Sequence, residues 1–389
     1  MTRSSDNITA KDLLQLIPED KFASIIEDTN VDYQVKKLFG RSMFYLLLYG
    51  LLEGTHTSLR SLAELFNSYR FKVIFHLLKD VKTKFNSISD RLSTMNVDFF
   101  REVYELLYKE FSNYYNHTEG IKYNITRVDS TMVTEASNKL KSGMVVGPKG
   151  KDGPKRIKFT MSLTNLLPSS IEIYTDQKFL SEDKAIPLAI HRHLDKRSDN
   201  VFVFDRGVSS RAAFNKLDDS SLCFVTRVNP NCRHEIISST TISETRIGNL
   251  DVKSDQKVIL FDKHNKKSNE FRLIKTVDEE GKPLWFISNL FEDDIDTIIK
   301  IYKKRWDIEV YFRFLKQELN LKHFISTSIN GIQIILYMTM ILSMLVLMYK
   351  KANGYGYREA KRKLYYEVDE LFAVLLAVIL GGDPNLVFR

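Results

Sequence analysis

Four polar side chains near the end of the sequence recur at helical spacing within the segment 293–319: Tyr302, Arg305, Glu309 and Lys316. At about 100° per residue, a continuous helix would bring the four within roughly 80° of one another. One helix face would then present a phenol, a guanidinium, a carboxylate and an ammonium in a row. Such a row suits the binding of phosphate groups beside a metal site. An ordinary surface face with an Arg305–Glu309 ion pair has the same spacing.

Two aspartates belong to segments that have the composition of β-strands. Asp129 lies in KYNITRVDSTMV, residues 122–133, and Asp205 ends the short apolar run in NVFVFDRG, residues 200–207. An unbroken apolar run is typical of a central strand that is covered on both faces. If the two strands are neighbours, their carboxylates and that of Glu309 can point to one place.

Three carboxylates in one place are suited to a pair of divalent cations. Cleavage of a phosphodiester needs a water that is nucleophilic at neutral pH and a leaving oxygen whose charge is neutralised. Two ions about 3.5–4 Å apart supply both, and Mg²⁺ prefers all-oxygen coordination. Without metal, the clustered carboxylates would repel one another and their pKa values would rise. Asp129, Asp205 and Glu309 are therefore the predicted catalytic residues and metal ligands.

The elements around the two aspartates follow a definite order. Strand-like segments at 122–133, 156–164 and 170–176 are rich in β-branched residues and separated by Pro/Ser turns. A helix at 181–194 follows, and then the strand at 200–207. Three strands, a helix and a strand is the order of the ribonuclease-H-like core. In such cores the first and fourth strands lie side by side, so that an acid on each points to one place.

The rest of the chain divides around this core. Residues 1–117 show apolar residues at helical spacing and suit a helical DNA-binding domain, in which Lys82, Lys84 and Arg91 could contact phosphates. A solvated face of a helical bundle explains each of these residues equally well. Residues 118–350 would form the catalytic core with an antiparallel β-rich insertion at about 208–290. The helical region 351–389 would either dimerise or close the core.

Composition bounds the class of protein. The 389 residues suit two or three domains, and 43% hydrophobic with 27% charged residues is an ordinary globular composition. The formal net charge of +8 favours a polyanionic partner such as nucleic acid, although a merely soluble basic protein fits as well. Two cysteines make no disulfide framework and no CxxC zinc pair, which fits a reducing cytoplasm. The first residues lack an apolar run, so we expect no signal peptide.

One uncharged apolar segment, residues 331–349, is long enough to span a bilayer. Gln333, Thr339 and Ser343 interrupt it, it follows a highly charged helix, and the chain has no matching second span. We therefore expect a central helix buried in a large α/β domain.

An HxH pattern, formed by His191 and His193, could suggest a metal site. The pattern falls on a predicted helix, where positions two apart point to different faces, so shared ligation is not expected. We expect both histidines at the surface.

The four helical residues match, without a gap, the YREK signature of the DDE transposases of the insertion-sequence-four family: Tyr302, Arg305, Glu309 and Lys316. Further matches are RVDST around Asp129, FDRG around Asp205, CFVTRV, and WFISN followed by IYKKRWDIEVYFRFLKQEL. The chain therefore resembles this family over roughly residues 120–345, and the signature in this position is specific.

The resemblance implies a fold and a reaction. The fold would be α/β, a ribonuclease-H-like catalytic core interrupted by a β-rich insertion after Asp205, preceded by a helical N-terminal domain and followed by C-terminal helices. The enzyme would hold two Mg²⁺ ions, with Mn²⁺ as a substitute, on Asp129, Asp205 and Glu309. It would carry out cut-and-paste transposition of an insertion sequence by nicking, hairpin formation, resolution by water and strand transfer.

The resemblance also implies DNA-binding residues and partners. Tyr302, Arg305 and Lys316 would bind DNA next to the cut, and Arg206 and Arg227 are further candidates, although an ion pair of Arg227 with an acid in the insertion fits equally well. In relatives, a tryptophan of the insertion holds a flipped base. Trp285 is the nearest candidate, although its distance from Glu309 in sequence does not match closely and a core role fits as well. The partners would be double-stranded DNA, as inverted-repeat ends and target, and a second copy of the chain. The location would be the bacterial cytoplasm, at the nucleoid, with no membrane.

Three other readings remain open. One is a nuclease with the same core that performs no strand transfer. Another is an inactive transposon-derived DNA-binding protein, against which the presence of all three acids and the whole signature argues. The third is a membrane protein built on residues 331–349.

Overall fold

The computed structural model describes residues 8–54, 57–114, 120–134, 140, 143–145, 155–193, 199–241, 245–321 and 324–382. These residues form two compact units. A helical unit contains the described residues up to 114 and those from 313 onward, and a mixed unit contains those of 120–134 and 143–312. Helices from the two ends of the chain thus belong to one unit. Their predicted roles in DNA binding and dimerisation stay predictions.

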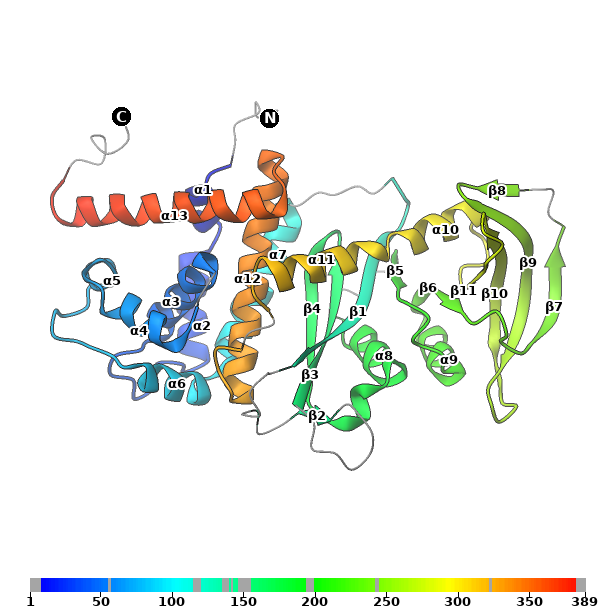
Figure 1. Ribbon diagram of the computed structural model, residues 1–389, viewed down its shortest axis with the longest axis horizontal. Coiled ribbons are helices and arrows are strands. Elements are labelled where there is room, and N and C mark those ends of the chain that lie inside the picture. The colour runs from blue at the N-terminus through cyan, green and yellow to red at the C-terminus, as the bar shows by residue number, and fades with distance from the viewer. Residues whose placement is uncertain are drawn as a thin grey trace. The chain divides into compact units, whose positions relative to one another are not determined.

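The helical unit is built from nine described helices (Figure 1): α1 (Ala10–Gln15), α2 (Glu19–Asp28), α3 (Gly40–Glu53), α4 (Leu59–Asn67), α5 (Tyr69–Ile74), α6 (Phe85–Thr94), α7 (Val97–Tyr114), α12 (Ile329–Asn353) and α13 (Tyr357–Ile379). Helix α12 contacts α3, α6, α7 and α13, and it forms the centre of this unit.

The apolar segment 331–349 lies in α12 and is a buried core helix, as predicted, although it belongs to the helical unit and not to the α/β domain that was expected. Its most apolar window has a mean hydropathy of 2.1 and is 89% buried. The polar residues that interrupt it are satisfied within the helix. Thr339 donates a hydrogen bond of 2.7 Å to the Ile335 carbonyl, and Ser343 donates one of 2.7 Å to the Met340 carbonyl. The same length and hydropathy would fit a membrane span, and the packing favours the core helix.

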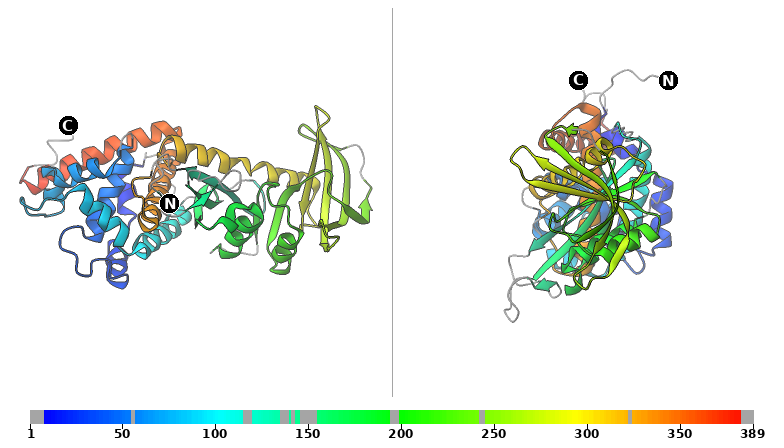
Figure 2. Two further views of the ribbon diagram at one scale, coloured as in Figure 1. Left: turned by 60° about the horizontal axis from the view of Figure 1, so that its bottom comes forward. Right: turned by 90° about the vertical axis from the view of Figure 1, so that its right-hand side faces the viewer.

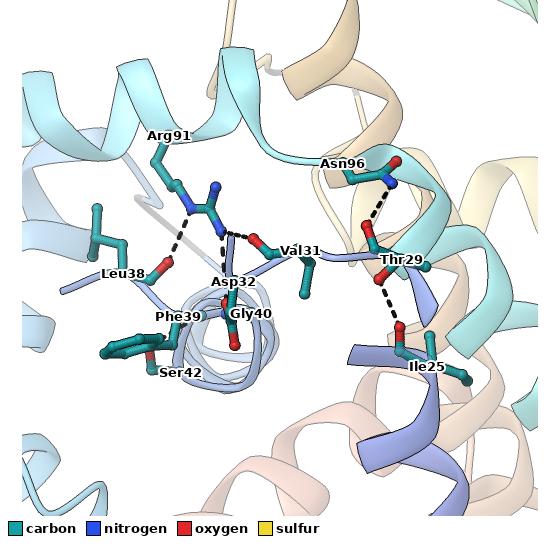
Figure 3. Close-up of polar contacts among 10 residues, drawn as sticks. All are labelled: Ile25, Thr29, Val31, Asp32, Leu38, Phe39, Gly40, Ser42, Arg91 and Asn96. Atoms are coloured by element: carbon teal, nitrogen blue, oxygen red, sulfur yellow. Dashed lines mark hydrogen bonds and ion pairs between the residues drawn. The ribbon is translucent and has the colours of Figure 1, made fainter. Parts of the chain in front are cut away.

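Arg91 of α6 ties down the loop between α2 and α3 (Figure 3). Its guanidinium donates to the carbonyls of Leu38 at 3.0 Å and Val31 at 2.5 Å, and it lies 3.8 Å from the carboxylate of Asp32. Asp32 in turn accepts from the backbone N–H of Gly40, the first residue of α3, at 2.5 Å. Because its Nε and Nη2 are engaged inside the fold, Arg91 has a structural role, and a contact with phosphates stays a prediction.

The mixed unit is organised around one sheet, whose described strands run from cyan-green to yellow in Figure 2: β1 (Asn124–Thr134), β2 (Met144–Val145), β3 (Lys155–Thr164), β4 (Leu167–Tyr174), β5 (Asn200–Val203), β6 (Cys223–Val228), β7 (His234–Thr240), β8 (Thr245–Ile247), β9 (Leu250–Phe261), β10 (Lys267–Asp278) and β11 (Pro283–Ser288). The order is β2-β3-β1-β5-β6-β11-β10-β9-β7, with β4 on β3 and β8 on β9. Strand β1 is antiparallel to β3 and parallel to β5. The predicted pairing of the first and fourth core strands is confirmed.

The β-rich segment extends this same sheet. Strand β6 pairs parallel with β5 on one side and antiparallel with β11 on the other, and β11, β10, β9 and β7 continue in antiparallel order. The segment CFVTRV is β6, so it is a parallel neighbour of β5. The prediction that it belongs to an antiparallel insertion is wrong.

Helices cover both faces of the central strands. A 3₁₀-helix (Gln177–Leu180) leads into α8 (Glu182–Arg192), and α9 (Arg211–Asp219) follows β5. Residues of α8 and α9 share one apolar core with Val128 and Phe202, whereas α10 (Ile295–Lys303) shares a second core with Ile125, Val201 and Val203. Strands β1 and β5 are therefore buried on both faces, which the apolar run of β5 predicts.

The predicted continuous helix 293–319 is in fact two helices, α10 and α11 (Trp306–Gln317), which follow one another in Figure 1. At the join, Arg305 N–H donates to the Tyr302 carbonyl at 3.0 Å and Asp307 N–H to the Lys304 carbonyl at 3.1 Å, which is the tighter 3₁₀ pattern. Tyr302, Arg305 and Glu309 consequently lie on α10, on the join and on α11. The prediction of one continuous helix is wrong, but Arg305 still contacts both Tyr302 and Glu309.

Arg127 of β1 supplies a physical reason for this break. Its side chain is fully buried, and its guanidinium donates to the Lys304 carbonyl at 3.1 Å and to the Asp307 carboxylate at 2.9 Å. It also donates to the Ile125 carbonyl at 2.9 Å. Arg127 thus binds both the Lys304 carbonyl and the Asp307 carboxylate, and these two bonds favour the 3₁₀ geometry of the join over a regular α-helical turn.

The histidine pair also differs from expectation. His193 is 1% exposed, its Nε2 lies 2.9 Å from the Ser169 hydroxyl, and its ring packs edge-to-face on Phe202. His191 is half-buried. The prediction of surface histidines is wrong for His193, because the end of α8 turns that side chain into a polar network inside the unit.

Candidate active site

Asp129 and Asp205 lie at the same level of two neighbouring strands. The parallel register of β1 and β5 ends with Arg127 opposite Val203. Asp129 follows two residues after Arg127, and Asp205 follows two residues after Val203. Pairing of the strands alone therefore brings both carboxylates to the same edge of the sheet, which is the juxtaposition that the sequence predicts.

The Asp129 carboxylate is mostly buried and faces other negative charges. Its Oδ1 accepts a hydrogen bond of 2.7 Å from the backbone N–H of Ser130. Burial raises the pKa of Asp129 to about 7, with the charges of Asp205 and Glu182 adding to the rise and the Ser130 hydrogen bond and Arg305 opposing it. The group thus changes its protonation near neutral pH, and a nearby cation would lower its pKa.

The turn after β5 holds Asp205 in place. Gly207 N–H donates to Asp205 Oδ1 at 2.7 Å, and the Thr226 hydroxyl donates to the carbonyls of Phe204 at 2.9 Å and Asp205 at 3.1 Å. A Cβ at position 207 would lie 2.8 Å from Asp205 Oδ1 and 3.1 Å from Glu182 Cγ. A glycine is therefore required by this close approach of the turn and the start of α8.

Glu182, the first residue of α8, is a site residue that the sequence analysis missed. One carboxylate oxygen accepts from Lys158 Nζ at 2.8 Å, and the Lys158 side chain is 1% exposed. The other oxygen is buried and has no hydrogen-bond partner among the described residues. Acids are common in the first turn of a helix, so the sequence signal was ambiguous; a lysine within the apolar strand β3 was the available hint.

Glu309 is paired with a cation at the join of α10 and α11. Arg305 Nη2 lies 2.6 Å from Glu309 Oε1. Burial lowers the pKa of Arg305. The hydrogen bond to Glu309 and the charges of Tyr302, Glu309 and Asp129 raise it, and together they outweigh burial, so the net shift is upward. The Arg305 guanidinium thus interacts with Glu309 by contact and with Asp129 through its charge.

Two arginines, Arg227 and Arg305, lie near the ring of Tyr302. The Cζ atoms of Arg227 and Arg305 lie 6.0 Å and 5.8 Å from the Tyr302 ring centroid. The ring packs edge-to-face on Phe286, with centroids 5.2 Å apart, and burial raises the pKa of its phenol. The Nε atoms of both arginines are buried and have no hydrogen-bond partner among the described residues. Arg305 is paired with Glu309, whereas Arg227 forms no ion pair with a described carboxylate and so suits an anion such as phosphate.

The other predicted residues lie in varied settings. Arg206 is exposed in the turn after Asp205. Lys316 lies in α11, seven residues after Glu309, and belongs to the helical unit. Trp285 lies in β11, partly buried, with Lys275 Nζ 4.6 Å from its ring centroid and the His234 ring edge-to-face at 5.6 Å. The indole is therefore in contact with its own sheet.

The described residues contain no group of three His, Cys, Asp or Glu side chains close enough together to hold a metal ion. Glu309 in particular faces Arg305. The chemistry of the acids nevertheless fits a hard divalent cation. A buried Asp129 lies among like charges, and Glu182 keeps a buried oxygen without a partner.

Comparison with known proteins identifies the class. The family model described as "Transposase DDE domain" matches residues 122–345, which is more than half of the chain. The chain therefore belongs to the DDE transposase family, whose members are enzymes that cleave and join DNA strands with divalent metal ions. The predicted family, enzyme class and DNA partner are confirmed at this level.

Individual relatives agree in name. A putative transposase for an insertion sequence element of Synechocystis sp. is 26% identical over 322 residues, which cover 81% of this chain and 82% of the relative. A probable insertion-sequence transposase of Geobacillus stearothermophilus is 27% identical over 35% of each chain. A cryo-EM structure of a piggyBac transposase synaptic complex with hairpin DNA has a TM-score of 0.44 and 15% identity, over 95% of this chain and 82% of that one. A TM-score at this level carries no weight for the fold.

Proposed function

We propose that this chain performs cut-and-paste transposition of a bacterial insertion sequence, with Asp129, Asp205 and Glu309 as its catalytic carboxylates on a ribonuclease-H-like core. The supporting observation is the register of β1 and β5, which brings Asp129 and Asp205 to one edge of the sheet. The charge interaction of Arg305 with Asp129 and its contact with Glu309 connect the third acid to the same region.

The three carboxylates would hold two Mg²⁺ ions, with Mn²⁺ as a substitute. When bound, the ions make a water nucleophilic at neutral pH and neutralise the leaving 3′-oxygen. The backbone N–H groups of Ser130 and Gly207 orient the Asp129 and Asp205 carboxylates. The unpartnered oxygen of Glu182 extends the oxygen donors of this edge.

The Arg305–Glu309 pair has to open for this function. A phosphate group arriving at the site can replace Glu309 as the anion on Arg305, because a guanidinium binds both in the same bidentate manner. Glu309 is then released toward Asp129 and Asp205. Arg227 and Tyr302 lie against the same guanidinium and would bind the same stretch of DNA.

Three further residues would bind DNA during the remaining steps of transposition. Arg206 and Lys316 would bind DNA phosphates, and Trp285 would hold a base while the hairpin forms, for which it must exchange its contacts with Lys275 and His234. The DNA would be the inverted-repeat ends of the element and the target. Two copies of the chain would act on paired ends, at the nucleoid of the bacterial cytoplasm, with each copy cutting in trans.

The test is cleavage of a labelled duplex that carries the DNA flanking this gene, in Mg²⁺ and in EDTA. Wild type is compared with Glu309→Gln and with the control Glu280→Gln, whose side chain is exposed in a turn. We expect Mg²⁺-dependent nicks and hairpins at the element boundary from wild type and the control only. Cutting that survives Glu309→Gln contradicts the site. Cutting without joining to a second duplex supports the nuclease alternative.

A further inference from the structure

A cavity of about 450 Å³ opens beside Asp205 in the mixed unit. Three arginines contribute to its lining, Arg206, Arg211 and Arg227, together with the single carboxylate of Asp205. Its volume falls within the roughly 300–1,000 Å³ range of small-molecule sites and exceeds what one phosphate group fills. The cavity therefore combines an excess of positive charge with room for an anion and the group attached to it.

Arg211 is the cation for which neither the sequence nor the family assigns a task. It is the first residue of α9 and half-buried. Its Nη1 donates to the Ser209 carbonyl at 2.7 Å and its Nε to the Phe261 carbonyl at 3.4 Å. No carboxylate of the described residues forms an ion pair with it. Burial lowers the pKa of Arg211, and the more distant charges of Cys232, Asp183 and Asp262 partly oppose this. A guanidinium stays protonated at any physiological pH, so the charge remains.

Several other arginines of the same unit are neutralised within the fold, although Arg156 and Arg233 form no ion pair with a described carboxylate. Five of them form ion pairs with carboxylates: Arg127, Arg192, Arg246, Arg272 and Arg305. Around the cavity, by contrast, the described residues give Arg206, Arg211 and Arg227 no such pair, and Arg227 keeps a buried Nε without a hydrogen-bond partner. Partly desolvated cations without a carboxylate are costly unless an external anion completes the site.

The wall of the cavity is held in place before any ligand arrives. The backbone N–H groups of Ser209 and Ser210 donate to Asp183 Oδ1 at 2.5 Å and 2.7 Å, which ties the loop between Asp205 and α9 to the start of α8. Arg211 is thereby presented from a fixed loop, so little ordering is needed on binding.

We propose that this cavity binds a phosphodiester group of DNA that neighbours the one being cut, with Arg211 as its clamp and Arg206 and Arg227 beside it. The inference rests on the proposed function, since it presumes DNA at Asp205. The Asp205 carboxylate in the lining repels a phosphate at close range, so the scissile group, which needs metal beside Asp205, is a different one. The extra volume accommodates the sugar attached to the clamped phosphate.

Binding of a labelled duplex, measured by fluorescence anisotropy at several salt concentrations, tests the clamp. Arg211→Gln is compared with the control Arg246→Gln, since Arg246 is exposed and pairs with Glu279 on the surface. We expect Arg211→Gln to weaken binding roughly tenfold and to reduce the slope of log affinity against log salt by about one, with the control unchanged. Wild-type affinity and slope in Arg211→Gln would overturn the inference.

Neutral methylphosphonates, placed singly along the duplex near the cut, identify the phosphate. In wild type, one position should weaken binding about as much as Arg211→Gln does, and that variant should be insensitive to the same position. A loss that remains additive at every position indicates a structural role for Arg211 and contradicts the clamp. Equal thermal unfolding midpoints exclude misfolding. If Arg211→Gln does not fold, Arg211→Lys, which keeps the charge but loses the forked geometry, must be less sensitive than wild type to the same methylphosphonate, and wild-type sensitivity would overturn the clamp.

The same binding and cleavage measurements distinguish the proposed function from the phosphate site at Arg211. If wild type does not bind the duplex at all, the proposed function itself is contradicted. If wild type binds and cleaves while Arg211→Gln behaves identically, only the clamp is lost.

Discussion

The acids of the candidate site fall into two electrically different regions. At the strand ends, Asp129 faces Asp205 and Glu182, and its pKa is raised to about 7. At the join of α10 and α11, Glu309 is neutralised by Arg305 at 2.6 Å. One region has an excess of negative charge that suits a cation, whereas the other is satisfied until an anion competes for its arginine.

The difference follows from how each region is built. Backbone groups fix the strand-end acids, through the β1–β5 register and the N–H groups of Ser130 and Gly207. A side-chain pair four residues apart positions Glu309, and such a pair can exchange partners at little cost because it is partly exposed. The site thus combines a rigid half with an adjustable half, which couples the arrival of DNA to completion of the acid set.

The largest expected effect is on cleavage by the rigid half. Asp129→Asn and Asp205→Asn should each lower the rate of Mg²⁺-dependent nicking at least about a thousandfold, because each removes a charge that a cation needs. Nicking of a labelled end duplex measures the effect. Asp251→Asn, at an exposed position of β9, is the matched control and should keep wild-type activity. Residual nicking within tenfold of wild type in Asp129→Asn would remove that residue from the site.

The next effect concerns pH. Since the folded-state pKa of Asp129 is raised to about 7 from an ordinary 3.8, the folded state binds this proton more tightly than the unfolded chain does. The free energy of unfolding should therefore fall as pH rises from about 4 to about 7, by at most roughly 4 kcal/mol, and stay low above pH 7. Urea unfolding across this range measures it. In Asp129→Asn, the free energy of unfolding should not show this decrease with pH. A pH dependence equal to that of wild type would mean that the pKa of Asp129 is not raised in the folded state.

The ion pair of Glu182 with the buried Lys158 can be compared with the exposed pair of Glu172 and Arg192. Glu182→Ala leaves the buried ammonium of Lys158 without its carboxylate and should lower the free energy of unfolding by about 3 kcal/mol. Glu182→Gln keeps an oxygen acceptor for Lys158 and should cost clearly less. Glu172→Ala removes the partner of the exposed Arg192 and should cost less than about 1 kcal/mol. Urea unfolding of the three variants in EDTA gives the ranking. Equal losses in all three would show that burial of Lys158 makes no difference.

The smallest effect belongs to the adjustable half. In a double-mutant cycle of Arg305→Met and Glu309→Gln, the coupling free energy for stability should be below about 1 kcal/mol, because the side chains are 15% and 33% exposed. Thermal or urea unfolding without DNA measures it. A coupling above about 2 kcal/mol would mean that the pair is a rigid structural element, and the proposed exchange of Glu309 for a phosphate would lose its basis.

Much of the site was predictable because it depends on local patterns. The order of three strands, a helix and an apolar strand places Asp129 and Asp205 on adjacent strands, and the pairing of β1 with β5 agrees. The apolar run 331–349 gave the choice between a membrane span and a core helix, and the polar residues within it pointed to the core. The family signature named the helix acid, and the family match is consistent with it.

The sequence by itself determined the types of chemical group, the order of elements and the family. Tertiary structure alone decided the break in the helix, the burial of His193, the participation of Glu182 and the basic cavity around Arg211. Each depends on side chains that meet from distant segments. Arg127 reaches Asp307 across 180 residues, and Lys158 of β3 meets the start of α8. Such pairs leave no periodic signal in the sequence, because only the packing of the sheet against its helices brings them within hydrogen-bond range.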